Sequence, residues 1–316
     1  MKKLNIGVDM GATKIYAGAV TYDGKILHRE MILTMVQRPW QEIADDVAAG
    51  VQKVLKKVNY TINDIGGVGI GCPGAISKDK SVVRESANFG WNKVPLQKYI
   101  SDKLQVPVKL ENDANLGVLG VGRFGEGKKS KILVGVFVGS GIGGGVLFDG
   151  KIFDGVGGSA AEVGHMIVQI DGPKCGCGTN GCWEAVAARL ALYRSMEAYV
   201  AGHGKNTRAG KEYSKAKNKA QALINGCKME DPGVLNIVHE SGRVLGIGIA
   251  TLINLFNPDM IAIGGGVVED LSRWIMPPLL KAVKKTAMKA PFKEVKIVET
   301  KLGNNAILLG GAALVM

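Results

Sequence analysis

Two stretches, LNIGVDMGATKIYAGAVTYDGKIL (residues 4–27) and ILVGVFVGSGIGGGVLFDGKIF (residues 132–153), share one plan. Each contains an apolar stretch, a turn with glycine, a second apolar stretch, an Asp-Gly-Lys turn and a third strand-like stretch. Apolar segments on both sides of an Asp-Gly turn are typical of β-hairpins. The repeated plan predicts a chain built from two related lobes.

The chain length, the first residues and the length of the longest apolar stretch limit the class of protein. A chain of 316 residues is long enough for two lobes with cores of their own. The first residues, MKKLNIGVDM, lack the apolar run of a signal peptide, and the longest apolar stretch, residues 244–256, is too short to span a bilayer. We therefore expect a cytoplasmic protein that does not insert into membranes.

The formal charge is +12, from 40 basic and 28 acidic residues. Such a charge is compatible with binding of nucleic acid, with binding of an anionic ligand or with a solvated surface, so its sign alone does not decide between these possibilities. Much of the local excess lies in residues 203–220, a polar stretch of irregular to helical character. We expect a solvated face there, and attraction of a nucleotide is the alternative.

The glycines of GSGIGG, residues 139–144, formally match the dinucleotide fingerprint Gly-x-Gly-x-x-Gly. That site needs a helix to begin at the glycines, whereas the following residues continue as strand, turn and strand. Backbone N–H groups of a glycine-rich hairpin can still hold phosphate, and a structural turn without ligand is the alternative. In the first copy, Asp9, Thr13 and Lys14 suit Mg²⁺ held through water and phosphate oxygens, whereas Phe137 replaces the acid in the second copy. We expect one lobe to hold the metal and the other mainly phosphate.

Candidate metal ligands with soft or borderline donor atoms lie close together in the sequence: His165, Cys175, Cys177 and Cys182. Thiolates and an imidazole suit tetrahedral Zn²⁺, and four protein ligands leave no open position for a reactive water. The spacing is not that of a nucleic-acid finger, so we expect a structural zinc, with an unmetallated cysteine loop as the alternative. The other two cysteines, Cys72 and Cys227, stand alone and are expected to be buried.

A polar group follows a short apolar stretch in VPVKLENDAN, residues 106–115. The pattern predicts a strand that presents polar side chains, among them Asp113, at its end, where ligands of α/β folds bind. A helix N-cap before ANLGVLG is the alternative role of Asp113.

These motifs together resemble the sugar-kinase branch of the ROK family, within the actin and hexokinase-like ATPases. The resemblance covers essentially the whole chain and rests on the order and spacing of DMGATK (9–14), GCPGAI (71–76), ANFGW (87–91), ENDAN (111–115), GSGIGGG (139–145), EVGH (162–165), the cysteine loop and NPDMIAIGGGV (257–267). It implies an α/β fold of two lobes, actin/hexokinase-like and ribonuclease H-like, with a cleft between them. We expect a small N-terminal lobe at residues 1–115, with the C-terminal helix 305–316 as a candidate addition, and a large lobe at residues 116–304 that carries the zinc loop and the nucleotide site.

The resemblance also implies roles for individual residues. Asp113 is the expected general base that takes the proton from a sugar hydroxyl. The expected contacts of the sugar are Asn88, Asn112, Glu162, His165 and Glu184. The expected contacts of ATP are Asp9, Gly11, Thr13, Lys14, Gly139, Ser140, Gly141, Gly265 and Gly266, with Mg²⁺ at Asp9 and structural Zn²⁺ at His165, Cys175, Cys177 and Cys182. Ser140 stands where the family pattern has threonine, a change that keeps the hydroxyl.

The residues themselves leave simpler roles open at several of these positions. Asn88 suits a turn, and Glu184 suits the first turn of a helix as an acid. Gly265 and Gly266 suit a plain connection from a strand to a helix.

The activity implied by the resemblance is ATP-dependent phosphorylation of the 6-hydroxyl of a hexose, with glucose first. Alternatives are a kinase for N-acetylmannosamine, mannose, fructose or allose, and a sugar sensor without catalysis. A repressor of the family would carry a helix-turn-helix segment, for which the stretch before Leu4 leaves no room. The expected partners are a small-molecule sugar and ATP, without nucleic acid or membrane, and the resemblance implies a homo-oligomer, dimer or tetramer.

Overall fold

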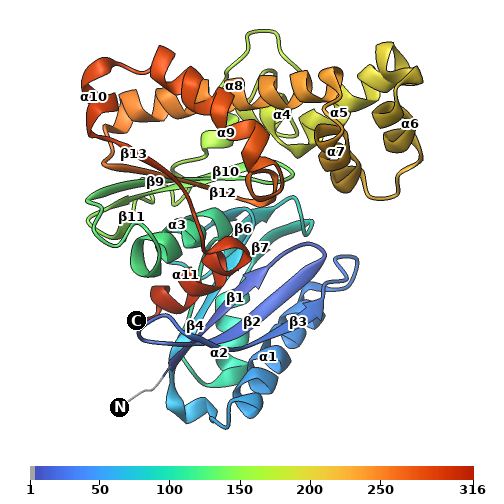
Figure 1. Ribbon diagram of the computed structural model, residues 1–316. Coiled ribbons are helices and arrows are strands. Elements are labelled where there is room, and N and C mark those ends of the chain that lie inside the picture. The colour runs from blue at the N-terminus through green and yellow to red at the C-terminus, as the bar shows by residue number, and fades with distance from the viewer. Residues whose placement is uncertain (1–3) are drawn as a thin grey trace. The chain divides into compact units, whose positions relative to one another are not determined.

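The computed structural model describes residues 4–316, which divide into two compact units (Figure 1). Unit 1 contains the described residues up to Gly135, together with Gly144–Ala161 and Thr300–Met316. Unit 2 contains Val136–Gly143 and Glu162–Glu299. This division differs from the expected one, because the residues just after 115 and a segment around 150 join the first unit.

The central sheet of unit 1 has the strand order β3-β2-β1-β4-β8. β1 pairs antiparallel with β2 and parallel with β4, and β4 pairs parallel with β8. The first three strands follow the predicted plan, with the Asp-Gly-Lys turn between β2 and β3. The strands are β1 (Leu4–Met10), β2 (Lys14–Thr21), β3 (Ile26–Leu33), β4 (Ile65–Cys72) and β8 (Val108–Asn112).

Helices cover both faces of this sheet (Figure 1). On one face lie α1 (Trp40–Lys57), which packs on β2 and β3, and α2 (Leu96–Leu104), which packs on β8. On the other face lie α3 (Asp113–Phe124) and α11 (Ala306–Leu314), which pack on each other and on β4. A small antiparallel sheet completes the unit, with β5 (Ala75–Ile76), β6 (Val83–Ser86) and β7 (Trp91–Val94).

The C-terminal helix α11 joins unit 1 through unusually close backbone packing. A Cβ atom added to Gly7 of β1 would lie 1.8 Å from the carbonyl oxygen of Leu308, and one added to Gly310 would lie 1.8 Å from that of Leu116 in α3. Only glycine permits these approaches, because every other residue would place a carbon inside a backbone oxygen. The last segment of the chain is thereby fixed against the first strand.

The second sheet has the order β11-β10-β9-β12-β13, and the boundary between the two units runs through β9 and β10. β10 begins directly after Gly141, so the glycines lead into a strand as predicted, and not into the helix of a dinucleotide fingerprint. The strands are β9 (Ile132–Val138), β10 (Ile142–Phe148), β11 (Lys151–Ile152), β12 (Met260–Gly264) and β13 (Lys296–Glu299).

Unit 2 is mainly helical outside its strands (Figure 1). The long helix α8 (Pro232–Phe256) packs along α9 (Gly266–Thr286) and ends at Asn257, whose left-handed backbone matches the predicted stop before β12. The other helices are α4 (Trp183–Ala187), α5 (Arg189–Ala201), α6 (Arg208–Lys215), α7 (Lys219–Lys228) and α10 (Lys289–Glu294). Residues 203–220 form a 3₁₀ turn, α6 and the start of α7, and their lysine and arginine side chains other than Lys219 are exposed.

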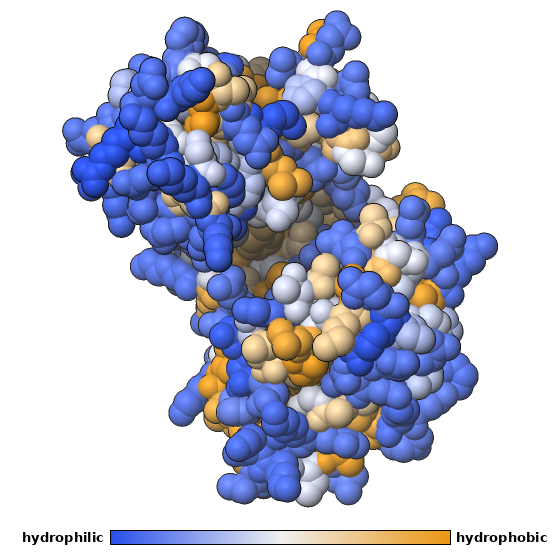
Figure 2. Space-filling model, turned by 90° about the vertical axis from the view of Figure 1, so that its right-hand side faces the viewer, coloured by the Kyte–Doolittle hydropathy of each residue, from blue (hydrophilic) through white to orange (hydrophobic). Residues whose placement is uncertain are grey.

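Hydrophilic residues cover most of the face drawn in Figure 2, and hydrophobic residues form smaller groups between them. The exposed apolar side chains include Leu27, Met31 and Leu33 on the edge strand β3. Within residues 4–316, helices lack the combination of length and apolarity that a membrane crossing requires. The expected oligomer and the cytoplasmic location stay predictions.

We expect Gly310→Ala to lower the free energy of unfolding by about 2 kcal/mol or more, because the new methyl group overlaps the Leu116 carbonyl. Alanine in a helix normally stabilises by up to about 1 kcal/mol relative to glycine, so a loss identifies the clash. Denaturant unfolding measures the change. The control is Gly157→Ala, where the nearest atom to a new Cβ lies 3.9 Å away; an equal effect of both changes would contradict the close-packing account.

Candidate active site

The carboxyl ends of three parallel strands meet at one edge of the unit 1 sheet. Asp9 of β1 pairs with Gly71 of β4, and Cys72 of β4 pairs with Asn112 of β8. Asp113, the next residue, begins α3. The sheet register therefore brings Asp9 and Asp113 to the same edge. This agrees with the prediction of a strand that presents polar side chains at its end.

The N-cap of α3 is Asn112, not Asp113. The Asn112 side-chain oxygen accepts hydrogen bonds from the backbone N–H of Ala114 at 2.9 Å and of Asn115 at 3.2 Å, and its amide donates to the Gly74 carbonyl at 3.2 Å. The alternative role of Asp113 as cap is therefore wrong, since the preceding residue performs it. The Asp113 carboxylate accepts from the backbone N–H of Ala114 at 2.9 Å.

Asp9 lies in an environment that opposes its ionisation. Burial, together with the negative charge of Asp113, raises the pKa of Asp9 to about 7, and the positive charge of Arg29 counteracts part of this shift. Two carboxyl groups at one sheet edge repel each other when both are ionised. A cation beside them would remove that repulsion, which makes this edge a candidate position for Mg²⁺.

The turn between β1 and β2 has the open form expected of a phosphate-binding hairpin. The Gly11 N–H donates to the Lys14 carbonyl at 3.0 Å, and the side chains of Thr13 and Lys14 are exposed. Thr34 after β3 holds this turn, since its hydroxyl donates to the Gly11 carbonyl at 2.8 Å and its N–H to the Thr13 carbonyl at 3.0 Å. Sequence reasoning missed Thr34, because the contact joins residues 23 positions apart.

Asn88 lies in the turn between β6 and β7, and its side chain is exposed. This position agrees with the simpler role of a turn residue and leaves the amide accessible to a ligand. Its expected contact with sugar stays a prediction.

In unit 2, the glycine turns after β9 and β12 lie against each other. A Cβ added to Gly265 would lie 2.6 Å from the Val138 carbonyl oxygen, and Gly265 itself has the left-handed φ of 89°. Gly266 begins α9, whose first turn has no side-chain cap, so its N–H groups are available to an anion. In the other turn, which includes the exposed Ser140, the Gly139 N–H donates to the Gly141 carbonyl at 2.8 Å.

Arg189 connects these turns with a pocket in the same unit. Its backbone N–H donates to the Gly139 carbonyl at 3.0 Å, and its guanidinium donates to Asp270 of α9 at 3.3 Å. The pocket has a volume of about 210 Å³, including the part open to solvent, and its wall is largely apolar. Its lining residues are Arg189, Leu192, Tyr193, Ala220, Leu223, Ile224, Val267, Asp270 and Leu271. Sequence reasoning did not find this pocket, because its walls come from α5, α7 and α9.

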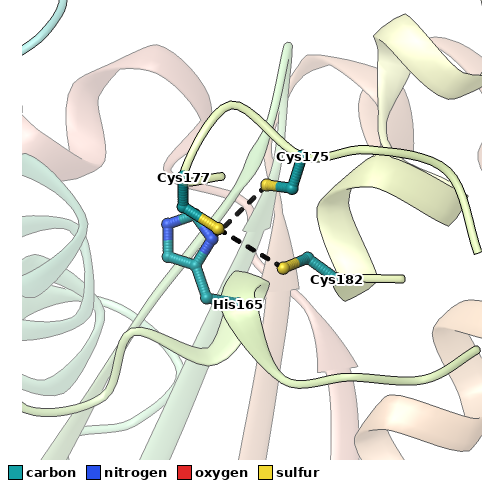
Figure 3. Close-up of side chains that lie close together, drawn as sticks. All are labelled: His165, Cys175, Cys177 and Cys182. Carbon is teal, nitrogen blue, oxygen red and sulfur yellow. Dashed lines mark hydrogen bonds between the residues drawn. The ribbon is translucent and has the colours of Figure 1, made fainter. Parts of the chain in front are cut away.

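The predicted metal ligands converge in one group (Figure 3). The candidate donor atoms of His165, Cys175, Cys177 and Cys182 all lie within 4.8 Å of one another. Cys177 Sγ is 3.6 Å from Cys182 Sγ, and His165 Nδ1 is 3.7 Å from Cys175 Sγ. Zinc–sulfur bonds of about 2.3 Å in a tetrahedron separate two sulfurs by about 3.8 Å, so the donor set fits Zn²⁺.

The cysteines of this group differ in acidity. A hydrogen bond from the backbone N–H of Thr179, the largest effect, lowers the pKa of Cys177 to about 7. Burial raises the pKa of Cys175 to about 12 and also raises that of Cys182. Cys72 and Cys227 are fully buried elsewhere, as expected.

Glu184, in the first turn of the short helix α4, joins the metal group to the phosphate turn. One carboxylate oxygen accepts from Cys175 Sγ at 3.1 Å, and the other accepts from the Ile142 N–H at 3.3 Å. A Cβ at Gly141 would lie 2.3 Å from that second oxygen. Glu162 is exposed just before His165, and its carbonyl accepts the His165 N–H at 3.1 Å.

The expected site residues thus divide between the two units. Those of unit 1 are Asp9, Gly11, Thr13, Lys14, Asn88, Asn112 and Asp113. Those of unit 2 are Gly139, Ser140, Gly141, Glu162, His165, Cys175, Cys177, Cys182, Glu184, Gly265 and Gly266.

Comparison with known proteins gives the family. The family model described as ROK family matches residues 5–316. The chain belongs to the ROK family. A glucokinase from Thermotoga maritima is 35% identical over 326 residues, which cover 100% of this chain and 98% of the relative. A crystal structure of a ROK family glucokinase from Streptomyces griseus in complex with glucose and AMPPNP is 30% identical, with a TM-score of 0.84 and 98% of each chain covered. The predicted α/β fold of the two-lobed actin/hexokinase-like class is confirmed.

The family also includes proteins of another class. A xylose repressor from Caldicellulosiruptor bescii is 30% identical over 311 residues, which cover 98% of this ROK chain and 77% of the repressor. Family membership therefore establishes the fold and leaves kinase and sugar-responsive repressor as the two activities to separate.

We expect Asp9→Asn to stabilise the protein at neutral and alkaline pH. The pKa of Asp9 is 3.8 in the unfolded chain, its ordinary value, and about 7 in the folded chain. Between these two pH values the folded chain therefore keeps a proton on Asp9 that the unfolded chain releases. The free energy of unfolding therefore falls as pH rises from about 4 to about 7, by up to about 4 kcal/mol, and stays at the lower value above. Asparagine removes this loss.

Denaturant unfolding at several pH values between 4 and 8 measures the difference between wild type and Asp9→Asn, and the variant should gain most at pH 8. Asp102→Asn, at an exposed side chain of α2, is the control that should leave the pH dependence unchanged. A difference between Asp9→Asn and wild type that is constant with pH would disprove the raised pKa.

Cys175→Ser should remove the bound metal and lower the melting temperature, because a structural zinc contributes its binding free energy to folding. Elemental analysis should find about one zinc per wild-type chain and far less in the variant. Cys227→Ser makes the same change at a buried cysteine outside the group, so it should keep its zinc whatever its stability. Equal zinc in Cys175→Ser and wild type would rule out Cys175 as a ligand.

Proposed function

We propose that this ROK protein is a sugar kinase that transfers the γ-phosphoryl group of ATP to the 6-hydroxyl of a hexose, with glucose as the first candidate. The observation that carries the proposal is the pair of carboxylates, Asp9 and Asp113, at the carboxyl edge of β1, β4 and β8. The similarity to glucokinases over the whole chain supports it. One carboxylate serves proton transfer and the other serves the cation.

Asp113 acts as the general base. Its carboxylate accepts the proton of the sugar hydroxyl as that oxygen forms a bond to the γ-phosphorus and the bond to the ADP oxygen breaks. The Ala114 N–H, at 2.9 Å from the carboxylate, orients the group. A base of ordinary acidity suffices here, because phosphoryl transfer depends mainly on positioning and electrostatics.

The proposed contacts of ATP include residues of each unit. The small apolar depression lined by α5, α7 and α9 is the proposed position of the adenine ring, and the uncapped N-terminus of α9 beside Gly265 is the proposed position of the phosphates. Thr13 and Ser140, which are exposed in the turns at Gly11–Lys14 and Gly139–Gly141, offer hydroxyls. Mg²⁺, when bound near Asp9, would neutralise charge that develops on the transferred phosphoryl group.

The metal group supports the sugar site. His165 turns Nδ1 toward Cys175, which leaves Nε2 free to donate to a sugar hydroxyl. Zinc, held by His165, Cys175, Cys177 and Cys182, would fix that orientation. Glu162, Glu184, Asn88 and Asn112 are the further proposed sugar contacts, and fixed polar partners of this kind discriminate between sugars by their hydroxyls.

A sugar-binding protein without phosphoryl transfer is the second candidate. It is favoured by the 30% identity to a xylose repressor over nearly the whole chain. Sugar and nucleotide binding without turnover would identify this class.

The test is ADP release by the purified protein with Mg-ATP across a panel of hexoses and N-acetylhexosamines, with a blank without sugar. Turnover dependent on one sugar supports the kinase and names the substrate among glucose, N-acetylmannosamine, mannose, fructose and allose. Absence of turnover with every sugar, while sugar binding persists, contradicts the kinase and supports the second candidate.

Asp113→Asn should lower kcat by about 100- to 10,000-fold, because the amide cannot accept the proton, while sugar affinity stays within about threefold. Calorimetric titration measures the affinity. Asp149→Asn, at the exposed Asp-Gly turn after β10, is the matched control and should keep wild-type kcat. Normal turnover in Asp113→Asn would exclude this residue as the base.

A further inference from the structure

A partly buried ion cluster, in which only Glu111 is fully buried, lies next to the proposed base in unit 1. Lys80 Nζ is 2.6 Å from Glu111 Oε2 and 2.7 Å from Asp154 Oδ1. The Lys80 side chain is 18% exposed and that of Glu111 only 1%. Neither Lys80 nor Asp154 belongs to the expected site residues, and the three come from separate segments of the chain.

Glu111 holds the residues that flank Asp113. Its other oxygen, Oε1, accepts from the Asn112 backbone N–H at 2.9 Å and from the Asn115 side-chain amide at 3.1 Å. These bonds fix the start of α3 on both sides of Asp113. The direction of the Asp113 carboxylate therefore depends on the position of the Glu111 side chain.

A buried carboxylate keeps this position only with a cation beside it. Without Lys80, the ionised Glu111 would be an uncompensated charge, and it would either take up a proton or turn toward water. Although burial alone would lower the pKa of Lys80, its hydrogen bonds to Asp154 and Glu111 and their charges raise it above its ordinary value. Lys80 is therefore a permanent cation at neutral pH.

The backbone around Lys80 is built to present this side chain. Lys80 has the left-handed φ of 62° in the turn between β5 and β6. Its carbonyl accepts the Leu110 N–H of β8 at 3.2 Å, so the turn is fixed directly beside the strand that carries Glu111. A lysine rarely adopts this backbone conformation without such surrounding contacts.

We propose that Lys80 is a positioning residue, which pairs with the buried Glu111 carboxylate and holds it in place so that Asn112 and Asp113 stay oriented for proton transfer. Asp154 supports the cation from the segment after β11. Its own carbonyl accepts the Ala160 N–H at 3.1 Å, which closes the loop that leads to Glu162. The inference rests on the proposed kinase function and adds Lys80 and Glu111 to its machinery.

The experiment combines steady-state kinetics with hydrogen–deuterium exchange of peptides that cover residues 109–116. Lys80→Met should lower kcat about tenfold or more and speed exchange in these peptides, whereas Lys80→Arg should keep at least about a third of kcat because the charge remains. Lys98→Met removes a lysine from the exposed pair with Asp102 and should change neither readout. Wild-type kcat and exchange in Lys80→Met would overturn the inference.

A second comparison separates positioning from a general structural role. If Lys80 acts through Glu111, adding Lys80→Met to Glu111→Gln should change kcat by less than about threefold, since no buried charge remains to be balanced. The comparison of Glu111→Gln with the double variant also tests the inference if Lys80→Met alone does not fold. A tenfold loss in both backgrounds would overturn the inference. A wild type that turns over no sugar would contradict the proposed function alone, because the exchange readout needs no substrate.

Discussion

The parallel pairing of β1, β4 and β8 brings two carboxyl groups to one edge of a sheet, and the chemistry of unit 1 depends on this pairing. The register places Asp9 beside Gly71, and the end of β8 directs Asp113 to the same edge. Burial and mutual repulsion make that arrangement costly, as the raised pKa of Asp9 reflects. The sheet holds the two acids together because its register is fixed by packing on both faces, including the backbone contact of Gly7 with α11. A cation bound at this edge turns the same repulsion into an attractive site.

The second copy of the hairpin plan, whose turn lies in unit 2, differs from the first in its electrostatic character. Where the first copy has Asp9, the second has Phe137, and the neighbouring groups are the uncapped N-terminus of α9 and the Arg189 guanidinium. An acid beside such an N-terminus would neutralise the partial positive charge that favours phosphate. The loss of the acid in the second copy therefore fits an anion site, and its retention in the first fits a cation site. The same hairpin plan thus carries an acid in one copy and an aromatic side chain in the other.

Much of this arrangement was predictable from the sequence, because it depends on local patterns. The repeated strands, the Asp-Gly turns, the polar end of β8 and the metal group all follow from residues near each other in the chain. The identity of the α3 cap did not, because Asn112 and Asp113 are both good caps and only the turn geometry chooses between them. The division into units also differed, because the residues just after 115 and Gly144–Ala161 join unit 1, although they follow the expected boundary in the chain. Contacts between residues far apart in the chain, such as Thr34 with Gly11 and Lys80 with Asp154, could not be predicted, because no local sequence pattern marks them.

The ion cluster around Glu111 lies beside the proposed base and retains charges that stability does not require. Replacing a buried ion pair with apolar side chains of similar size is often neutral or stabilising, so stability alone does not explain Lys80 and Glu111. An apolar pair would fill the space, yet it could not accept the Asn112 N–H and the Asn115 amide, which point at Glu111 Oε1. Hydrogen bonds to a charged acceptor are short and directional, whereas apolar contacts leave rotation about side-chain bonds less restricted. The hydrogen bonds to Glu111 thus fix an orientation, and the ion pair with Lys80 holds the carboxylate in that place.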